Sequence, residues 1–477
     1  MSVTVLDDLA VPPLAVERFE SFLSAAQYAD LLDAAALARL VLHERVLWCV
    51  NSTARGGGVA EMLGSLLGYA RGSGVDARWV TIDGPAEFFV VTKRLHHRLH
   101  GFPGDGGPLG ESERALYESV SAENVAGLVE RVRPGDVVLL HDPQTAGLTS
   151  ELKARGAAVI WRLHIGADVS NEHVAEAREF LVPYVQHAHA CVFSRPQFIW
   201  PALDPTRCRV IAPSIDALSP KNQPMEPATV TAILQSTGLL GDGDPADSVF
   251  LRRDRSPGRV ERRAQVTEEA PVPPDAPLVA QVSRWDDLKD PAGVVSGFAR
   301  ALPDLGDAHL ILAGPDVAAV TDDPEGARVL REVTELWHGL PADARSRVHL
   351  ATLPMEDPEE NAAIVNALQR RADIIVQKSR AEGFGLTVAE AMWKSRAVLA
   401  TRVGGIQDQI VDGLSGVLVD DPDDLETFGR KLSLLIYDGG FRSRLGAAAC
   451  ERVREQFLES RHLQDWVVLL REFAPTD

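Results

Sequence analysis

The chain has 477 residues, and its 48 Lys and Arg against 68 Asp and Glu give a formal net charge of −20 at pH 7. A chain of this length is too long for one compact core, so we expect two or more domains. The acidic balance argues against a nucleic-acid partner, and no apolar run is long enough to span a bilayer, so we expect neither nucleic acid nor membrane as a partner.

The cysteines, the histidines and the first residues indicate the compartment and the metal content. The four cysteines form no Cys-x-x-Cys pair, which argues against structural zinc and a disulfide framework. The cluster His96-His97-x-x-His100 lacks the Glu of His-Glu-x-x-His, so we expect no metal there. Residues 1–8 have neither the basic start nor the apolar region of a signal peptide. We therefore expect a cytoplasmic protein.

The first part of the chain alternates apolar runs with helical patterns. This alternation predicts a doubly wound α/β domain, with a parallel sheet covered by helices on both faces. The rhythm breaks at 213–277, where several Pro, many charges and Gly241-Asp242-Gly243-Asp244 predict a linker and irregular loops. The expected strands are 45–50, 77–82, 136–140, 157–163 and 189–193, with a helix at 59–71.

The alternation then resumes and predicts a second domain of the same kind. We assign 1–215 to the first Rossmann-like domain and 216–457 to the second, and we expect the C-terminal helix, within 458–477, to pack back on the first. In such sheets ligands bind beyond the carboxyl ends of the strands, so we expect a central cleft between the domains. The expected strands are 278–282, 309–313, 348–350, 372–376 and 397–400, with helices at 387–393 and 460–473.

Two carboxylates eight positions apart, Glu382 and Glu390, are the most informative feature of the sequence. Gly383 and Gly385 between them allow a tight turn, and the helix that begins there offers unpaired amides for a phosphate. Eight helical positions span about 12 Å, whereas the carboxyl groups of a retaining glycosidase lie only about 5 Å apart. The pair therefore fits a long ligand, with sugar hydroxyls at one carboxylate, a diphosphate at the helix and a ribose at the other carboxylate.

Two loops at predicted strand ends could contact such a ligand. Residues 51–61 place three adjacent glycines before a helix, without the pattern of a dinucleotide fingerprint or a Walker loop, and a flexible turn is the alternative. Residues 283–290 carry Arg284, suited to bidentate phosphate contact, and Lys289, suited to a point-charge contact. The alternative for this second loop is a solvated turn with three surface ion partners, Asp286, Asp287 and Asp290.

Polar residues also follow strands of the first domain. His141 and Asp142 close one strand and His164 closes another, where a histidine can orient a hydroxyl, although a single histidine is more often structural. Asp83 and Glu87 lie beside aromatic residues, a combination common in sugar sites, and the first turn of a helix is the alternative.

These residues resemble the retaining nucleotide-sugar glycosyltransferases of family four, which have the two-domain GT-B fold. Arg284 with Lys289, and the segment from Glu382 to Glu390, carry the general resemblance. More narrowly, the chain is similar to the trehalose glycosyltransferring synthases, with trehalose phosphorylases as close relatives. This narrower resemblance lies in 51–61, 79–89, 141–144, 161–164 and 213–222.

The resemblance implies reversible formation of α,α-trehalose from a nucleoside-diphosphate glucose and glucose, with front-face attack that retains the α configuration. It implies catalytic roles for Arg284 and Lys289 at the leaving diphosphate, for Glu382 at the donor glucose and for His164 beside the reacting carbon. It further implies a homodimer, no cofactor and no obligatory metal. The implied donor contacts also include Gly57, Gly58, Met355, Gly383, Phe384, Gly385, Leu386, Thr387 and Glu390, and the implied acceptor contacts are Asp83, Glu87, His141 and Asp142.

Several alternatives stay open. Arg252-Arg253-Asp254-Arg255 stands where the family pattern has Arg-x-Asp-Gly, which bears on the acceptor. A trehalose phosphorylase would use inorganic phosphate in place of the diphosphate, and a related transferase would use another acceptor. The Glu-x7-Glu pair argues against an epimerase of nucleotide sugars. A non-catalytic sugar-nucleotide-binding protein is disfavoured because all four of Arg284, Lys289, Glu382 and Glu390 are present. ADP-, UDP- and GDP-glucose are all candidate donors.

Overall fold

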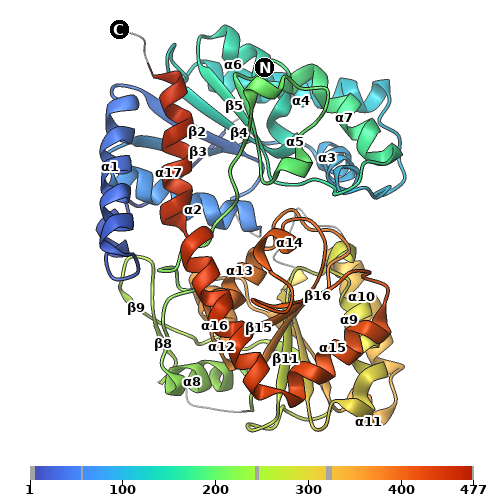
Figure 1. The fold of residues 1–477 in the computed structure, drawn as a ribbon. Helices are drawn as coiled ribbons and strands as arrows, with labels where there is room; N and C mark the ends of the chain where they lie inside the picture. Colours follow the sequence, from blue (N-terminus) through green and yellow to red (C-terminus); the bar gives the residue numbers. More distant parts are fainter. Residues whose placement is uncertain (1–5, 55–56, 242–246, 318–324, 475–477) are drawn as a thin grey trace. The chain divides into compact units, whose positions relative to one another are not determined.

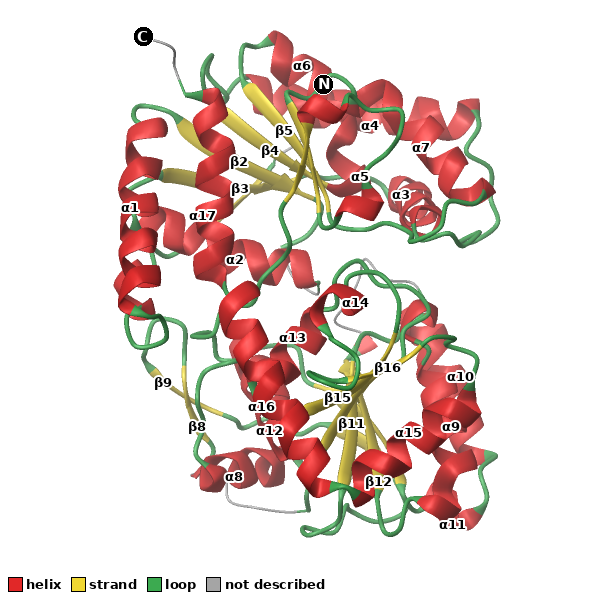
Figure 2. Ribbon diagram, in the orientation of Figure 1, coloured by secondary structure: helices red, strands yellow, loops and turns green. Residues whose placement is uncertain are grey.

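The computed structural model describes residues 6–54, 57–241, 247–317 and 325–474 (Figures 1 and 2). Three features of the sequence lie outside the described residues: the first five residues, Arg55 with Gly56 of the glycine loop, and the linker residues 242–244. The chain divides into two compact units, both of the predicted α/β class. Unit 1 contains Met1–Ser214, Glu382–Phe384 and Phe457–Asp477, and unit 2 contains Ile215–Ala381 and Gly385–Gln456.

Unit 1 is built on a sheet with the strand order β1-β3-β2-β4-β5-β6-β7 in the described part of the chain. Neighbouring strands are parallel except for β1 and β3, so the predicted parallel sheet has one antiparallel edge. The strands are β1 (Asp7–Leu9), β2 (Val46–Asn51), β3 (Asp76–Thr81), β4 (Val137–His141), β5 (Ala158–Leu163), β6 (Ala190–Phe193) and β7 (Cys208–Val210).

Alternate residues of strand β2 enter two different cores on the two faces of this sheet. Leu47 and Cys49 join a core with residues of α1, α2 and α17, whereas Trp48 and Val50 join a core with residues of α3, α4 and α7. Because both faces are buried, the strand appears in the sequence as an unbroken apolar run. The helices of unit 1 are α1 (Ala25–Val41), α2 (Gly58–Gly72), α3 (Ala86–Leu99), α4 (Glu111–Val129), α5 (Asp142–Thr145), α6 (Thr149–Ala154), α7 (Glu172–Val185) and α17 (Glu459–Leu470).

Unit 2 repeats this plan, with the strand order β10-β13-β12-β11-β14-β15-β16 among the described residues. Only β10, at the edge, runs antiparallel to its neighbour β13. The strands are β10 (Gln265–Thr267), β11 (Leu278–Val282), β12 (His309–Pro315), β13 (Val348–Leu353), β14 (Ile374–Gln377), β15 (Ala397–Thr401) and β16 (Val417–Val419). The helices are α8 (Pro227–Thr237), α9 (Pro291–Ala301), α10 (Gly326–His338), α11 (Ala342–Arg345), α12 (Pro358–Arg371), α13 (Leu386–Trp393), α14 (Ile406–Gln409), α15 (Leu425–Tyr437) and α16 (Gly439–Gln456).

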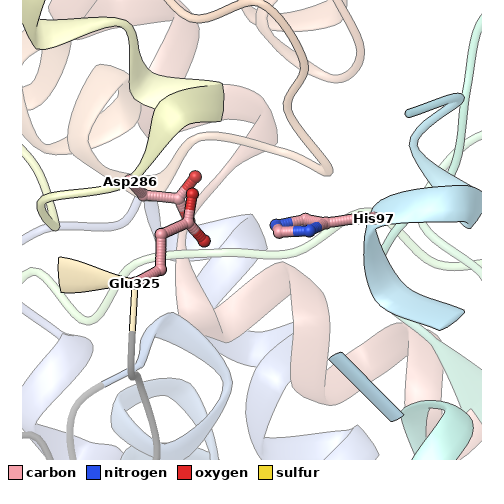
Figure 3. Close-up of side chains that lie close together, drawn as sticks. All are labelled: His97, Asp286 and Glu325. Atoms are coloured by element: carbon pink, nitrogen blue, oxygen red, sulfur yellow. The ribbon is translucent and has the colours of Figure 1, made fainter. Parts of the chain in front are cut away.

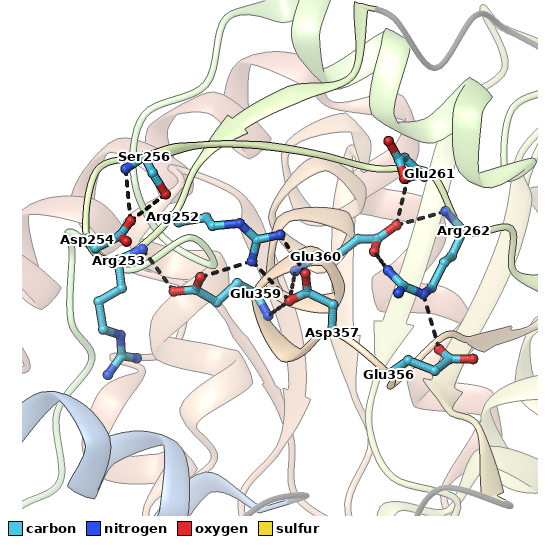
Figure 4. Close-up of polar contacts among 10 residues, drawn as sticks. All are labelled: Arg252, Arg253, Asp254, Ser256, Glu261, Arg262, Glu356, Asp357, Glu359 and Glu360. Atoms are coloured by element: carbon cyan, nitrogen blue, oxygen red, sulfur yellow. Dashed lines mark hydrogen bonds and ion pairs between the residues drawn. The ribbon is translucent and has the colours of Figure 1, made fainter. Parts of the chain in front are cut away.

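A two-stranded ribbon, β8 (Val249–Leu251) and β9 (Pro257–Arg259), packs on the first turn of α12 through charged groups (Figure 4). Arg252 donates to Asp357 at 2.6 Å and to Glu359 at 3.2 Å. Glu360, which is 1 % exposed, accepts backbone N–H groups of Glu261 at 2.7 Å and Arg262 at 2.8 Å. The arginine-rich segment that departs from the family pattern thus begins with a residue that holds this ribbon in place.

Among the described residues, every helix is either too short or too polar to cross a membrane.

Candidate active site

In unit 2 the strand order reverses between β11 and β14, which are parallel neighbours. Chain segment 283–290 leaves the carboxyl end of β11, and segment 378–381 leaves that of β14. In open α/β sheets, ligands bind in the crevice beyond the strand ends at such a reversal. The structure therefore brings the cationic loop and the residues that lead toward α13 to the position where this fold binds ligands.

Arg284 holds a buried acid at this strand end. Its Nη2 donates to Oδ2 of Asp286 at 2.9 Å, and the Arg284 side chain is 33 % exposed whereas that of Asp286 is 1 % exposed. Oδ1 of Asp286 accepts the Leu288 N–H at 2.8 Å, so the same carboxylate also shapes the turn. The alternative of a solvated loop is therefore wrong for Asp286, which orients the guanidinium from inside the unit.

Glu325 lies beside Asp286 (Figure 3), with carboxylate oxygens of the two residues within 4.8 Å of each other. Glu325 accepts the backbone N–H of Asp287 at 3.1 Å. Burial raises the pKa of Asp287, and Glu325 adds to this rise while Arg328 opposes it. His97, also drawn in Figure 3, belongs to α3 of unit 1, whereas the two carboxylates form one group within unit 2. They anchor the loop that carries Arg284.

Lys289 is fixed through its main chain. Its carbonyl accepts Nε2 of Gln281 at 3.1 Å, and Oε1 of the same glutamine accepts the N–H of Lys378 at 3.2 Å. The N–H of Lys289 donates to the carbonyl of Asp286 at 2.9 Å. One amide side chain thus ties the loop after β11 to the residue that follows β14, and this tie sets where the half-buried Lys289 lies.

Helix α13 begins at the expected place for an anion site. Gly385 precedes it with φ +86° and ψ +66°, a left-handed conformation that favours glycine, and no described side chain caps the helix. The first amides, at Leu386 and Thr387, lie at the positive end of the helix dipole. The local structure supplies the anion-binding chemistry that the sequence predicted, while contact with a donor stays a prediction.

Glu390 is buried inside unit 2. Its side chain is 3 % exposed, and its Oε1 lies 3.6 Å from Nζ of Lys221. Nζ of Lys394 contacts Oε1 of Gln369 at 2.7 Å and Oδ1 of Asn222 at 2.9 Å. Gln369 in turn donates to Glu390 at 3.4 Å. Glu390, the residue predicted to bind the ribose, is thus held within a polar network that keeps its carboxylate in one orientation.

Two histidines form a pair in unit 1. Nδ1 of His141 and Nε2 of His164 lie 3.0 Å apart, and the rings stack at 5.3 Å. Burial, with a smaller contribution from Arg162, lowers the pKa of His141 to about 3 and that of His164 well below its ordinary value. Both rings are therefore neutral at pH 7, and one must donate its proton to the other. The hydrogen bond thereby couples the tautomers of the predicted catalytic histidine and a predicted acceptor ligand.

Asp142 supports the same pair through the main chain. Its Oδ1 accepts the N–H of His164 at 2.8 Å, and its own backbone has φ +64°, an uncommon value for a residue other than glycine. Burial raises the pKa of Asp142 to about 7, and Arg162 opposes this rise. The structure shows that Asp142 fixes the backbone of His164, while its predicted contact with the acceptor stays a prediction.

The segment Glu382–Phe384 belongs to unit 1 and packs against the end of β5. A Cβ atom added to Gly383 would lie 2.4 Å from the carbonyl oxygen of His164, so only glycine fits this close approach. The ring of Phe384 lies 5.5 Å from that of Phe457. The structure therefore brings two parts of the predicted site together, because the first turn after Glu382 contacts the backbone of the predicted catalytic histidine.

The remaining candidates lie at strand or helix ends without a contact that fixes their role. Asp83, after β3, is exposed and accepts the Gly84 N–H at 2.8 Å, and Glu87 is exposed in the first turn of α3. Gly58 begins α2 and Gly57 is its N-cap residue, and half-buried Met355 follows β13.

Sequence reasoning missed Arg162, which lies two positions before His164 in β5. It is fully buried, and burial lowers the pKa of its guanidinium to about 9 although Asp142 opposes the shift. Its Nη1 donates to the carbonyl of Phe193 at 3.1 Å. A single arginine inside an apolar strand was the available signal, because such a charge is rarely buried without a reason.

Comparisons with known proteins identify the family of this chain. Residues 49–200 match the family model described as trehalose synthase, N-terminal domain, and residues 354–452 match that of glycosyl transferases group 1. A trehalose synthase from Pyrococcus horikoshii is 34 % identical over 429 residues, which cover 89 % of each chain. The chain belongs to the trehalose synthase family.

More distant relatives bear on the fold and on the alternatives. A trehalose phosphorylase from Pleurotus pulmonarius is 25 % identical over 389 residues, which cover 77 % of this chain and 49 % of that one. The UDP-forming α,α-trehalose-phosphate synthase structure from Burkholderia xenovorans superimposes with a TM-score of 0.65, covers 91 % of this chain and 100 % of that one, and shares 16 % identity. This likeness shows the fold, and the predicted GT-B fold is confirmed for this trehalose synthase family member.

Proposed function

We propose that this trehalose synthase family member transfers glucose from a nucleoside-diphosphate glucose to free glucose and forms α,α-trehalose reversibly. Family membership supports trehalose as the product class. The residues of unit 2 support a donor with a diphosphate, and those of unit 1 support a sugar beside His164. The α configuration is retained, with the departing phosphate taking the proton of the attacking hydroxyl.

The arrangement of cations and amides in unit 2 carries the proposal. Arg284 and Lys289 follow β11, and the helix N-terminus beginning at Gly385 belongs to the connection that follows β14, the neighbour of β11. As the glycosidic bond breaks, negative charge develops on the diphosphate, and fixed positive groups aimed at that charge stabilise the transition state. The role we assign to Arg284 and Lys289 is this neutralisation, which requires no divalent metal.

The groups of unit 1 are suited to position rather than to attack. His141 and His164 are neutral at pH 7, so neither ring is a strong acid there, and both can accept or donate a hydrogen bond to a sugar hydroxyl. The role we assign to Glu382 is to accept hydrogen bonds from hydroxyls of the donor glucose. Catalysis then rests on orientation and on charge stabilisation at the leaving group.

The test is a product assay with a matched pair of variants. The wild type is incubated with ADP-, UDP- or GDP-glucose and glucose, in EDTA, and nucleoside diphosphate and disaccharide are quantified. We expect them in equal amounts, and Lys289→Met should lower kcat/KM by about 10²-fold or more. Arg331→Ala removes an exposed cation of α10 in the same unit and should change kcat/KM less than about twofold. A disaccharide yield of zero with all three donors contradicts the proposal.

A parallel incubation with trehalose and inorganic phosphate, without nucleotide, separates the main alternative. A phosphorylase would form glucose 1-phosphate from trehalose and inorganic phosphate, and would not require a nucleotide. The phosphorylase relative is matched over about half of its own length, whereas the synthase relative is matched over 89 %. This difference favours a synthase over a phosphorylase.

A further inference from the structure

Lys378 is a buried cation that the proposed reaction does not use. It follows β14 directly, is 1 % exposed, and its ammonium contacts the carboxylate of Asp290. Arg380 lies farther from the same carboxylate, with Nε at 3.6 Å from Oδ1. Lysine is almost never fully buried unless it is paired, so this contact between two strand ends of unit 2 requires an explanation.

Stability alone does not explain the pair. Removing two charges from water costs more than their attraction commonly returns, and well-packed apolar residues of similar size are often as stabilising. A buried pair is better explained by the geometry that it imposes. The geometry in question is that of Asp290, because the ammonium contacts its carboxylate, while the backbone N–H of Lys378 donates to Gln281.

Asp290 has an unusual backbone and two tasks. Its φ of +50° is left-handed, which costs free energy for a residue with a side chain. Its Oδ1 accepts the Gly293 N–H at 3.2 Å and so caps helix α9, and it directly follows Lys289. An ammonium that holds the Asp290 carboxylate therefore also holds the direction in which the chain leaves Lys289.

We propose that Lys378 is a positioning residue for diphosphate binding: through Asp290, and together with Gln281, it fixes the backbone of Lys289 so that the lysine meets the diphosphate of the donor. This inference rests on the proposed function. Lys378 does not itself touch the ligand, because its ammonium is buried against Asp290. A 1 Å displacement of a group such as Lys289 is enough to weaken its contact severely.

The test compares the affinities of nucleoside monophosphate and nucleoside diphosphate, with the base that the wild type prefers, by calorimetry. The Kd of the monophosphate divided by the Kd of the diphosphate measures the contribution of the second phosphate. A general loss of stability does not change this ratio. In Lys378→Met we expect this ratio to fall by about tenfold, the effect of losing one hydrogen bond to a charged group. Arg442→Met is the matched control, since Arg442 is also a cation of unit 2 that is half-buried, but it donates to the carbonyls of Leu435 and Ile436. Its ratio should equal that of the wild type.

A second variant keeps the test decisive if Lys378→Met does not fold. Lys378→Met with Asp290→Asn leaves no unpaired buried charge, and Asn retains a cap and tolerates left-handed φ. Its ratio should also fall well below that of Arg442→Met. A wild-type ratio in either Lys378 variant overturns the inference alone. A wild type that binds no nucleoside diphosphate overturns the proposed function, and the inference with it.

Discussion

The contact between Gly383 and His164 gives the sharpest prediction for a single atom. In Gly383→Ala the new methyl group would lie 2.4 Å from the His164 carbonyl oxygen, whereas ordinary contacts of a Cβ begin at 3.4 Å. The difference, 3.4 − 2.4 = 1.0 Å, is the shift that one of the two backbones must make. Both partners are main chain, so no flexible side chain can absorb the shift.

Such a shift should affect activity more than stability. A displacement of about 1 Å at a reacting group can cost about 10²-fold in rate, and an extra methyl in a packed region costs about 1–3 kcal/mol of unfolding free energy. We therefore expect kcat/KM for nucleoside-diphosphate release to fall about 10²-fold and the thermal midpoint to fall by several degrees. The assay is steady-state kinetics with the preferred donor, together with thermal unfolding.

Gly326→Ala is the matched control for this prediction. Gly326 is buried at the start of α10, and its added Cβ would have only ordinary contacts, the nearest at 3.6 Å. Alanine is also the better helix former, so the control should keep its activity and its thermal midpoint. If Gly383→Ala behaves like this control, with kcat/KM within about twofold of wild type, the close approach of 383 to His164 does not matter for the reaction and the reasoning is refuted.

Three further predictions use other parts of the structure. Gly385→Ala should weaken nucleoside-diphosphate binding, measured by calorimetry, because a φ of +86° costs an alanine about 1–2 kcal/mol. Gly385→Asn should lose less affinity, because asparagine tolerates a left-handed φ better. Equal losses of affinity in the two variants would contradict the role of φ. Glu360→Ala should lower the unfolding free energy by about 2 kcal/mol or more, since two backbone N–H groups lose their acceptor. Arg252→Ala, at a partly exposed ion pair, should cost only about 0–1 kcal/mol in the same denaturation experiment, and the reverse ranking would be inconsistent with Figure 4. Finally, burial lowers the pKa of His309 to about 4 in the folded state, against about 6.5 in the unfolded chain. Between these two pH values the unfolded state binds more protons than the folded state. Stability is therefore lost as the pH falls from about 6.5 toward about 4. The thermal midpoint of His309→Asn should fall less steeply over this range, and an unchanged slope would contradict the assignment.

Most of the sheet could be predicted from the sequence because its central strands are buried on both faces. Such strands are unbroken apolar runs, and the expected 278–282 coincides with β11, while 397–400 lies within one residue of β15. The three-residue strands β1, β7, β8, β9, β10 and β16 were missed, since so short a run carries no clear period. Helix α1 was also missed because alanines blur its apolar face, although the capping box of Ser24 and Gln27 was an available signal.

The candidate site was predictable where it follows strand ends and not where it depends on distant contacts. The order of the strands places Arg284 and Lys289 at the reversal of the sheet, as the motif indicated. The burial of Asp286 and Asp290 could not be predicted, because it depends on partners such as Lys378, 88 positions away from Asp290. The pairing of His141 with His164 likewise depends on β4 and β5 being neighbours, which no local pattern states.

The most direct test of the account is the identity of the product made from a labelled donor. A nucleoside-diphosphate glucose labelled with ¹³C at the anomeric carbon is incubated with unlabelled glucose and followed by NMR. The account predicts α,α-trehalose with label in one ring, both linkages α, and nucleoside diphosphate released in equal amount. A labelled product with a β linkage, or label found only in free glucose, would contradict retaining transfer to glucose.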